Sequence, residues 1–509
     1  MDHLTRLVNS CLLPAYGGAA PPDWLKRALD DSLAGIVLYG ANLGLLDGRI
    51  REDVTAPLRA LRPDLVVALD EEGGDITRAE YHRGSNYPGN LALGVVDDTA
   101  LTAEVASAIA ADLRNLGVTM NLAPSADVCP GFHLPVFGTR SFGPDAGRVA
   151  AHTRAFVEAT QRHRVAATAK HFPGLGATRV DSHYALPVVD APEELFRARD
   201  LAPFASAVRA GVQAVMTGHV VVEALDSVPA TFSERLLRDV LRGELGFEGV
   251  VVSDALDMKA AQAGAGIGGA AVRALRAGVD LVITGPQDGE KDCAEILESV
   301  RGAVADGSLP LARLEEAAER VARLRAWTSG PAEPAADGGT AGLAADGGTA
   351  GLAADGGTAG LAAARRAVEL RGPRPTPAPR FVVELRPEPS ISCGTVPWGL
   401  TGPLARLGGL AGQLTAEPGT PPDELRVPDG VATAVVVRAE AADAWQTAVL
   451  AALTAARPDT VVVDMGFHDL PVPAGTTVLK TYGAGLVNAV AAAEILTGRR
   501  APGPPRDTW

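Results

Sequence analysis

Ala169 to Leu186 reads A-K-H-F-P-G-L-G-A-T-R-V-D-S-H-Y-A-L, directly after the short apolar run Val165-Ala-Ala-Thr168. The apolar run has the length of a buried strand, whereas the proline and glycines after it favour a turn. Lys170 and His171 are therefore expected where a strand ends. Because a barrel of parallel strands carries its chemistry at the carboxyl ends of the strands, this stretch predicts both a fold and a site.

The spacing of Asp181 and His183 has a chemical consequence of its own. A carboxylate two residues from an imidazole can accept a hydrogen bond from one ring nitrogen, which fixes the tautomer and raises the basicity of the other nitrogen. Histidine titrates near neutrality, so it can donate and accept a proton in one catalytic cycle. A simpler interpretation is a pair that only holds a loop in place.

The first 328 residues show a regular alternation of short apolar runs and amphipathic stretches, which predicts a parallel sheet. We identify seven such runs: Gly35–Tyr39, Leu65–Leu69, Val118–Ala123, Val165–Thr168, Val212–Thr217, Gly249–Ser253 and Val279–Thr284. Seven strands are one short of a closed (β/α)8 barrel. The pattern alone leaves two folds open over residues 1–328, namely a barrel in which one strand is weak, absent or unread, and a doubly wound open sheet.

A nine-residue repeat follows the predicted barrel. The unit A-A-D-G-G-T-A-G-L begins at Ala335, Ala344 and Ala353. A calcium-binding β-roll is one possible origin of such a repeat. The unit has only one acidic residue, however, so we predict a flexible Gly/Ala-rich linker over residues 329–364.

Residues 365–509 have a second alternating pattern. Phe381–Leu385, Val431–Val437 and Thr460–Met465 are predicted strands, and Trp445–Ala456 and Gly485–Thr497 are predicted helices. The pattern predicts a small α/β domain, and the segment contains no catalytic motif.

Composition restricts the partners. The net charge of -15 argues against nucleic acid and against an anionic membrane, since both require a basic face. The four cysteines are scattered and include no C-x-x-C pair, so neither a disulfide framework nor a zinc cluster is expected. The first residues lack the features of a signal peptide, and a cytoplasmic location is expected.

Three more clusters of polar residues stand at predicted strand ends or on loops. They are D-E-E-G-G-D-I-T-R (70–78), F-G-T-R-S-F-G (137–143) and E-G-V-V-V-S-D-A-L-D-M (248–258). In the last of these, Asp254 directly follows a buried apolar run and is therefore expected at the mouth of the barrel. Asp70 could instead cap a helix, and Arg140 could be a surface side chain in a turn.

The string K-H-F-P-G-x-G-x-T-x-x-D-S-H, with these three clusters in the same order, resembles the bacterial β-N-acetylglucosaminidases of glycoside hydrolase family 3. The resemblance implies that residues 1–328 form a (β/α)8 barrel. The ending L-K-T-Y-G-A-G-L-V-N-A-V-A-A-A-E-I-L-T-G-R-R (479–500) is similar to the close of the family's second domain, which implies a smaller α/β sandwich-like fold for residues 365–509. The resemblance also implies Asp254 as nucleophile and His183, held by Asp181, as acid/base. It also implies sugar-binding side chains, namely Asp70, Arg78, Arg140, Lys170, His171 and Met258. No metal or cofactor is implied. Leu175 and Ala177 depart from the subgroup, which usually has His and Asp there.

The resemblance implies a retaining glycoside hydrolase that removes terminal β-linked N-acetylglucosamine from small oligosaccharides such as muropeptide or chitin fragments. A β-glucosidase or xylosidase, a phosphorylase and an inactive N-acetylglucosamine-binding protein are the alternatives. A metal-dependent hydrolase would instead use three histidines as ligands, His171, His183 and His219. His219 follows the apolar run Val212–Thr217 and is expected to face the site, although a core or loop-bracing role is equally compatible with its position.

Overall fold

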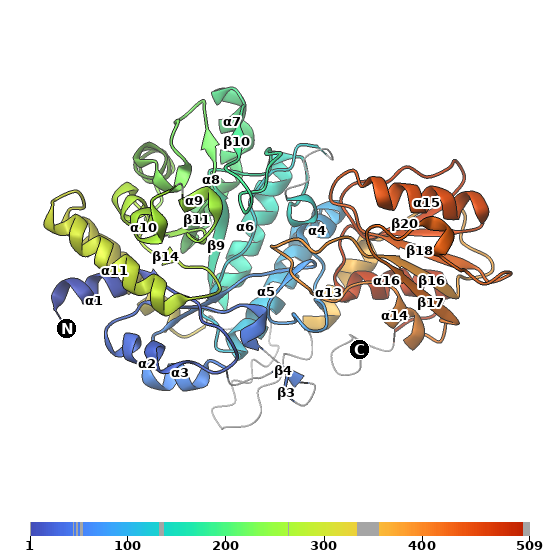
Figure 1. Ribbon diagram of the computed structural model, residues 1–509, viewed down its shortest axis with the longest axis horizontal. Helices are drawn as coiled ribbons and strands as arrows, with labels where there is room; N and C mark the ends of the chain where they lie inside the picture. The colour runs from blue at the N-terminus through green and yellow to red at the C-terminus, as the bar shows by residue number, and fades with distance from the viewer. Residues whose placement is uncertain are drawn as a thin grey trace.

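The structure is a computed structural model that describes residues 2–43, 45–46, 49–50, 54–131, 137–262, 264–332 and 356–501. It contains an N-terminal barrel and a smaller C-terminal domain, which lie side by side (Figure 1).

Eight parallel strands form the barrel: β1 (Leu12–Leu13), β2 (Gly35–Val37), β5 (Val66–Leu69), β8 (Met120–Asn121), β9 (Ala166–Phe172), β11 (Ala214–Thr217), β13 (Val250–Ser253) and β14 (Val282–Ile283). The strands from β2 to β13 pair in chain order, and β1 pairs with β14. Two further contacts close the ring. The Val37 N–H donates to the Pro14 carbonyl at 2.9 Å, and a parallel bridge joins Val252 to Leu281.

The predicted barrel is therefore confirmed, and the open sheet is wrong. The strand missing from the seven predicted runs is β1, where the apolar run Cys11–Leu13 has only three residues before Pro14. A run of that length carries no periodicity that sequence patterns can detect.

Side chains that alternate along the strands fill two separate hydrophobic cores, one outside the ring of strands and one inside it. Ile36 and Val67 belong to the large cluster between the strands and the outer helices. Their neighbours Val37 and Ala68 belong to a smaller cluster inside the barrel. Successive residues of a strand point to opposite faces, so one apolar run supplies both cores.

Helices surround the strands (Figure 1). The helices of this layer are α1 (His3–Asn9), α2 (Asp23–Asp30), α3 (Ala56–Leu61), α5 (Thr99–Asn115), α6 (Ala146–Arg162), α8 (Leu201–Arg209), the π-helix η4 (Arg235–Glu244), α10 (Gly266–Ala277), α11 (Gly289–Ala305) and α12 (Leu311–Thr328). Asp98 and Asp145 cap α5 and α6 by accepting hydrogen bonds from the first-turn backbone.

Shorter elements occupy the connections. They are η1 (Gly40–Leu43), β3 (Leu45–Leu46), β4 (Arg49–Ile50), β6 (Glu71–Gly73), β7 (Ile76–Thr77), α4 (Asn90–Val96), η2 (Gly138–Arg140), β10 (Val188–Val189), α7 (Glu193–Arg199), β12 (Val221–Val222), η3 (Ala230–Phe232) and α9 (Lys259–Gln262). The β6–β7 hairpin directly follows β5 and therefore stands on the carboxyl-end rim.

The C-terminal domain has one sheet with helices on both faces. Its strands are β15 (Glu369–Arg371), β16 (Phe381–Leu385), β17 (Gly412–Ala416), β18 (Thr433–Val437), β19 (Val461–Asp464) and β20 (Thr477–Lys480), in the spatial order β15-β20-β19-β18-β16-β17. All pairs are parallel except β15 with β20. Helices α14 (Thr401–Arg406) and α16 (Leu486–Thr497) supply one apolar cluster, and α15 (Ala444–Ala456) supplies the other. The predicted α/β sandwich is confirmed; η5 (Pro422–Glu424) lies in a connection.

Helix α13 (Gly356–Ala367) corrects the end of the predicted linker. Residues 333–355 lie outside the described residues, but residues 356–364 are helical. Leu361 and Ala364 are buried in the core of the C-terminal domain, whereas Ala363 joins the core of the barrel. The last copy of the repeat therefore contributes to a helix that packs on both domains.

Gly360 permits this close packing. A Cβ at Gly360 would lie 2.0 Å from the Asn86 carbonyl oxygen, whereas a Cβ at Gly302 in α11 would meet nothing within 4 Å. Gly360→Ala is expected to lower the free energy of unfolding by about 1–3 kcal/mol. Gly302→Ala, the matched control, is expected to be neutral or to stabilise by up to about 1 kcal/mol. Denaturant unfolding of both variants checks this, and equal effects would contradict the close contact.

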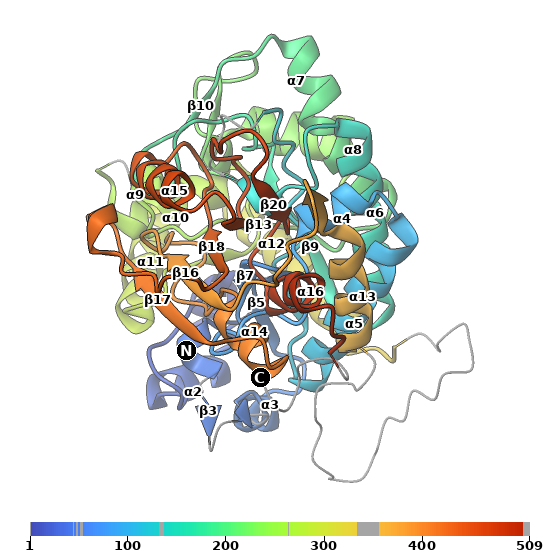
Figure 2. The same cartoon turned by 90° about the vertical axis from the view of Figure 1, so that its right-hand side faces the viewer.

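Figure 2 shows the C-terminal domain lying in front of the barrel, and buried polar contacts join the two domains. Asp75 of the β6–β7 hairpin forms an ion pair with Arg438 at 2.8 Å, and both side chains are nearly buried. The Thr139 N–H donates to Glu440 at 3.3 Å. Burial, with the nearby Asp75 carboxylate, raises the pKa of Glu440. The loops after β16 and β18 are therefore fixed against the rim of the barrel.

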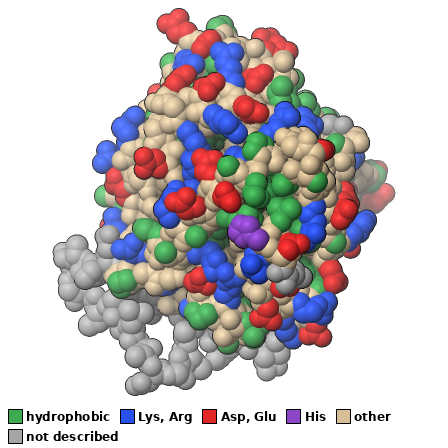
Figure 3. All heavy atoms as spheres, turned by 90° about the vertical axis from the view of Figure 1, so that its left-hand side faces the viewer, with side chains coloured by type: hydrophobic (Ala, Val, Ile, Leu, Met, Phe, Trp, Pro, Cys, Tyr) green, Lys and Arg blue, Asp and Glu red, His purple; other side chains and the backbone are tan. Residues whose placement is uncertain are grey.

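The face of the barrel turned away from the C-terminal domain carries acidic and basic side chains interspersed (Figure 3). Among the described residues, none of the helices is both long enough and apolar enough to cross a membrane.

Candidate active site

A cavity of about 350 Å³ opens at the carboxyl ends of the barrel strands, where barrel enzymes place their active sites. Its wall includes eight of the residues predicted from sequence: Asp70, Arg78, Arg140, Lys170, His171, His183, Asp254 and Met258. The ninth, Asp181, is bonded to His183 and lines a neighbouring cavity. The C-terminal domain completes the wall with Ile391, Ser392 and Gly394. No motif in the sequence of that domain indicates which of its residues reach the site.

Lys170 is the centre of a buried ionic network on one side of the cavity. Its ammonium lies 2.6 Å from Asp70 and 2.8 Å from Glu72. Arg140 donates to both oxygens of Glu72, at 2.7 and 3.1 Å. Burial disfavours charge on these acids, but the cations outweigh it, so the pKa values of Asp70 and Glu72 are lowered. Both carboxylates are therefore ionised acceptors.

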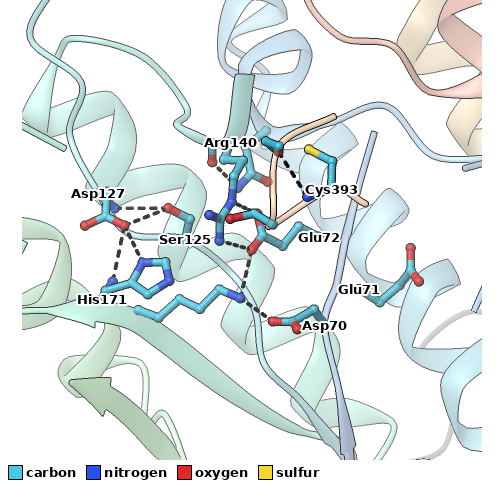
Figure 4. A network of polar contacts seen from close by, with 12 residues as sticks. Asp70, Glu71, Glu72, Ser125, Asp127, Arg140, His171 and Cys393 are labelled. Carbon is cyan, nitrogen blue, oxygen red and sulfur yellow. Dashed lines mark hydrogen bonds and ion pairs between the residues drawn. The ribbon is translucent and has the colours of Figure 1, made fainter. Parts of the chain in front are cut away.

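Glu72 was not identified from the sequence as a residue of the site, because Asp70 is followed by two adjacent glutamates that the sequence alone does not distinguish. In β6 successive side chains point to opposite faces. Glu72 joins the network, whereas Glu71 lies apart from it (Figure 4). The second oxygen of Glu71 accepts from Thr77 and from the backbone of the hairpin, and burial raises the pKa of Glu71 to about 8. The hairpin thus uses one glutamate for its own support and one for the site.

Arg78 links the network to the second domain. It lies 3.7 Å from Asp70 and donates to the Ser392 carbonyl at 2.8 Å. The guanidinium therefore spans the boundary between the barrel and the loop that follows β16.

His171 is held by Asp127, another residue that sequence reasoning missed (Figure 4). The His171 Nδ1 lies 2.8 Å from Asp127 Oδ2, and the Leu175 N–H donates to the other oxygen at 2.6 Å. Because an ionised carboxylate only accepts, the Nδ1 atom carries a proton. Asp127 thus fixes both the imidazole and the turn after β9.

His183 and Asp181 form the pair that their spacing predicted. Both the backbone N–H and the ring Nδ1 of His183 donate to the same Asp181 oxygen, at 2.9 and 2.7 Å. Burial disfavours the imidazolium, but the carboxylates of Asp181 and Asp254 outweigh it and raise the pKa of His183. The ring lines the cavity, and its Nε2 is the atom left for proton transfer.

Asp254 stands directly after β13, as expected. One of its oxygens accepts from the Ala255 N–H at 2.8 Å. The neighbouring Asp257 also lines the cavity, where burial and the charge of Asp254 raise the pKa of Asp257. Both carboxyl groups therefore face the cavity, and ionisation of Asp257 is disfavoured.

His219 braces the Asp254 loop instead of lining the cavity. It is fully buried, its Nε2 donates to the Ala255 carbonyl at 3.1 Å, and its Nδ1 lies 2.8 Å from the Thr231 hydroxyl. Burial lowers the pKa of His219, so the ring is neutral. The structure therefore agrees with the predicted role of His219 as a brace for a loop, and not with a role in lining the cavity.

Comparison with known proteins agrees with this geometry. Residues 23–324 match the family model described as the glycosyl hydrolase family 3 N terminal domain. The chain belongs to glycosyl hydrolase family 3. A beta-hexosaminidase of Xanthomonas oryzae pv. oryzae (strain MAFF 311018) is 35% identical over 288 residues, which are 55% of this chain and 83% of the relative. One from Methylococcus capsulatus is 34% identical over 251 residues, covering 49% and 74%.

Among solved structures, a family 3 beta-N-acetylglucosaminidase from Paenibacillus sp. str. FPU-7 is 30% identical with a TM-score of 0.84, covering 98% of both chains. The arrangement of two domains is therefore shared with a family 3 structure. The beta-N-acetylhexosaminidase from Beutenbergia cavernae DSM 12333 is 29% identical with a TM-score of 0.56, and covers 64% of this chain and 99% of that one.

The departure at Leu175 from the family 3 subgroup has a packing role. Leu175 is buried, and a Cβ at Gly218 would lie 2.6 Å from its side chain. Leucine thus fills the space between the turn after β9 and the end of β11. Ala177 is partly exposed, and nothing in the structure explains its identity.

The three histidines of the alternative metal site each have a separate protein partner: Asp127 for His171, Asp181 for His183 and Thr231 for His219. Within the part of the chain that the structure describes, no group of three or more His, Cys, Asp or Glu side chains could hold a metal ion.

Proposed function

We propose that this family 3 chain is a retaining glycoside hydrolase that removes terminal β-linked N-acetylglucosamine from small oligosaccharides such as muropeptide or chitin fragments. The observation that carries the proposal is the presence of Asp254 and the Asp181-held His183 at one cavity. The names of the Xanthomonas and Paenibacillus relatives support the sugar.

Glycoside cleavage with retention needs a nucleophile and an acid/base. In the first step the Asp254 carboxylate attacks the anomeric carbon and forms a covalent glycosyl-enzyme. The His183 Nε2 gives its proton to the departing oxygen, and Asp181 stabilises the imidazolium before transfer. In the second step His183 takes a proton from water, whose oxygen displaces Asp254 and releases the sugar.

The buried network holds the sugar. Two of the three Lys170 N–H groups are directed to Asp70 and Glu72, so one remains for a sugar hydroxyl. Asp70, ionised by the adjacent cations, accepts from hydroxyls, and Arg78 and Arg140 donate. The Nε2 of His171, the ring nitrogen that Asp127 does not use, is left to bond a sugar hydroxyl. Met258 supplies an apolar contact. Such charge-assisted bonds are about twice as strong as neutral ones.

A panel of nitrophenyl β-glycosides, assayed with and without phosphate, tests the proposed function. The N-acetylglucosaminide is expected to be cleaved best, with free sugar as product in both conditions. Preference for a glucoside or xyloside, formation of a sugar phosphate, or binding without release would each support one of the alternatives and reject this function.

The raised pKa of His183 predicts the pH profile. The first step requires protonated His183, and a raised pKa keeps the proton on the ring to higher pH. For a disaccharide, kcat/KM is therefore expected to fall only above the ordinary histidine value of 6.5. Asp181→Asn removes the neighbouring charge and should move this fall to lower pH. An unmoved profile would contradict the coupling of the two residues.

A further inference from the structure

A second cavity, of about 760 Å³, lies in the C-terminal domain. Strand β16 pairs with β17 on one side and with β18 on the other, so the chain reverses direction across the sheet at β16. Open α/β sheets bind ligands at such a switch point, outside the carboxyl ends of the strands. Residues 386–390, 417–418 and 438–443, which directly follow β16, β17 and β18, line this switch-point cavity.

The switch-point cavity adjoins the active site. Gly394 lines both it and the catalytic cavity. A third cavity, of about 230 Å³, shares Arg140 and Ser392 with the catalytic cavity and Ser390 with the switch-point cavity. Asp181 also lines this third cavity. The loop after β16 therefore borders all three cavities, which lie next to one another between the acid/base pair and the switch point.

The arginines of the switch-point cavity are already paired. Arg438 forms its ion pair with Asp75, and Arg386 forms one with the buried Glu384. Both guanidinium groups lie over the ring of Trp398, at 4.3 Å for Arg386 and 5.5 Å for Arg438. These contacts fix the cations and neutralise them.

The remaining lining favours a neutral polar ligand. Beside the two paired arginines the wall has three acids, Glu388, Glu417 and Asp443, and a fourth carboxyl, Glu440, whose ionisation is disfavoured by burial. It also has three hydroxyl side chains, Ser390, Thr395 and Thr415. An excess of acids repels phosphates and carboxylates. Carboxylates and hydroxyls suit sugar hydroxyl groups, each of which donates and accepts hydrogen bonds.

We propose that the switch-point cavity binds the distal sugar units of a neutral oligosaccharide whose terminal unit occupies the catalytic cavity. The inference rests on the proposed function and restricts the class of preferred substrates. The preferred substrates are neutral chains longer than a disaccharide, and the C-terminal domain is the part of the protein that recognises their length.

The test measures kcat/KM for neutral β-linked N-acetylglucosamine oligomers of increasing length and for the nitrophenyl monosaccharide. Going from the dimer to the tetramer is expected to raise kcat/KM about tenfold, the equivalent of one or two additional neutral hydrogen bonds. Oligomers oxidised to a terminal carboxylate should gain less than neutral ones of equal length.

Ala442→Trp should fill the switch-point cavity and abolish the gain with length, while cleavage of the nitrophenyl substrate stays within about twofold. Ala452→Trp, on the exposed face of α15, is the matched control and should keep the gain. Glu417→Ala, at the end of β17, repeats the test by truncation and should reduce the gain.

Activity that does not change with length in the unmodified protein, or a gain that survives both Ala442→Trp and Glu417→Ala, would overturn this inference alone. A larger gain for the oxidised oligomers would overturn the preference for neutral chains. Failure to release N-acetylglucosamine from every substrate, the nitrophenyl one included, would reject the proposed function itself.

Discussion

Asp254→Asn is expected to lower the turnover of a nitrophenyl N-acetylglucosaminide by roughly four orders of magnitude, as loss of a nucleophile does in other hydrolases. The amide keeps the shape of the side chain and one oxygen for the Ala255 N–H, but it removes the charge that attacks the anomeric carbon. Steady-state kinetics of the purified variant measures the loss. Little change in the fold is expected, because Asp254 makes no ion pair among the described residues.

Asp257→Asn is the matched control, since Asp257 is a carboxylate of the same loop and the same cavity. Ionisation of Asp257 is disfavoured by burial and by Asp254, so its amide should cost far less. A fluorinated substrate analogue that traps glycosyl-enzymes should label Asp254 in the unmodified protein, as read by peptide mass spectrometry. A label on Asp70 or Asp257 would overturn the assignment.

The parts of the fold that the sequence predicts are those encoded by local patterns. Each long strand of the barrel is an apolar run followed by a turn, so its position and its carboxyl end are visible in the sequence. Strand β1 lies in an apolar run of only three residues, Cys11–Leu13, and becomes recognisable only through its pairing with β14. The helical end of the repeat, around Gly360, depends on contact with Asn86 and has no local signature.

The candidate site also combines contacts that are local in the sequence, and therefore predictable, with contacts between distant residues that are not. Asp181 and His183 are two residues apart, so their hydrogen bond could be predicted from spacing alone. Asp127 is 44 residues from His171 in the chain, and Ser392 is 314 residues from Arg78. Such partners meet only after the barrel closes and the C-terminal domain docks, and no pattern along the chain indicates which residues will meet.

The C-terminal domain both forms part of the catalytic wall and holds the rim of the barrel in place. Ile391, Ser392 and Gly394 form part of the catalytic wall, while Arg438 from the same domain holds Asp75 of the barrel. A buried ion pair that loses one partner leaves an uncompensated charge, which is strongly destabilising. The position of the second domain is therefore coupled to the rim that carries Asp70 and Arg78.

His183→Ala tests whether proton transfer sets the rate. With a natural disaccharide the leaving oxygen needs a proton, so kcat/KM is expected to fall about a thousandfold. A nitrophenolate needs little protonation, so the first step with a nitrophenyl substrate should survive much better. Tyr184→Ala, an exposed neighbour on the same loop, is the control and should leave both substrates nearly unaffected.

With the nitrophenyl substrate, His183→Ala should accumulate glycosyl-enzyme, because no base remains to activate water in the second step. A burst of nitrophenol should precede a slow steady state. Azide, a nucleophile that needs no base, should restore part of the rate and yield a glycosyl azide. Asp181→Ala should show a milder form of the same pattern, since the imidazole remains but loses the partner that orients it. Equal losses for good and poor leaving groups, without rescue by azide, would mean that His183 only shapes the loop, and the proton carrier would then be another residue of the rim.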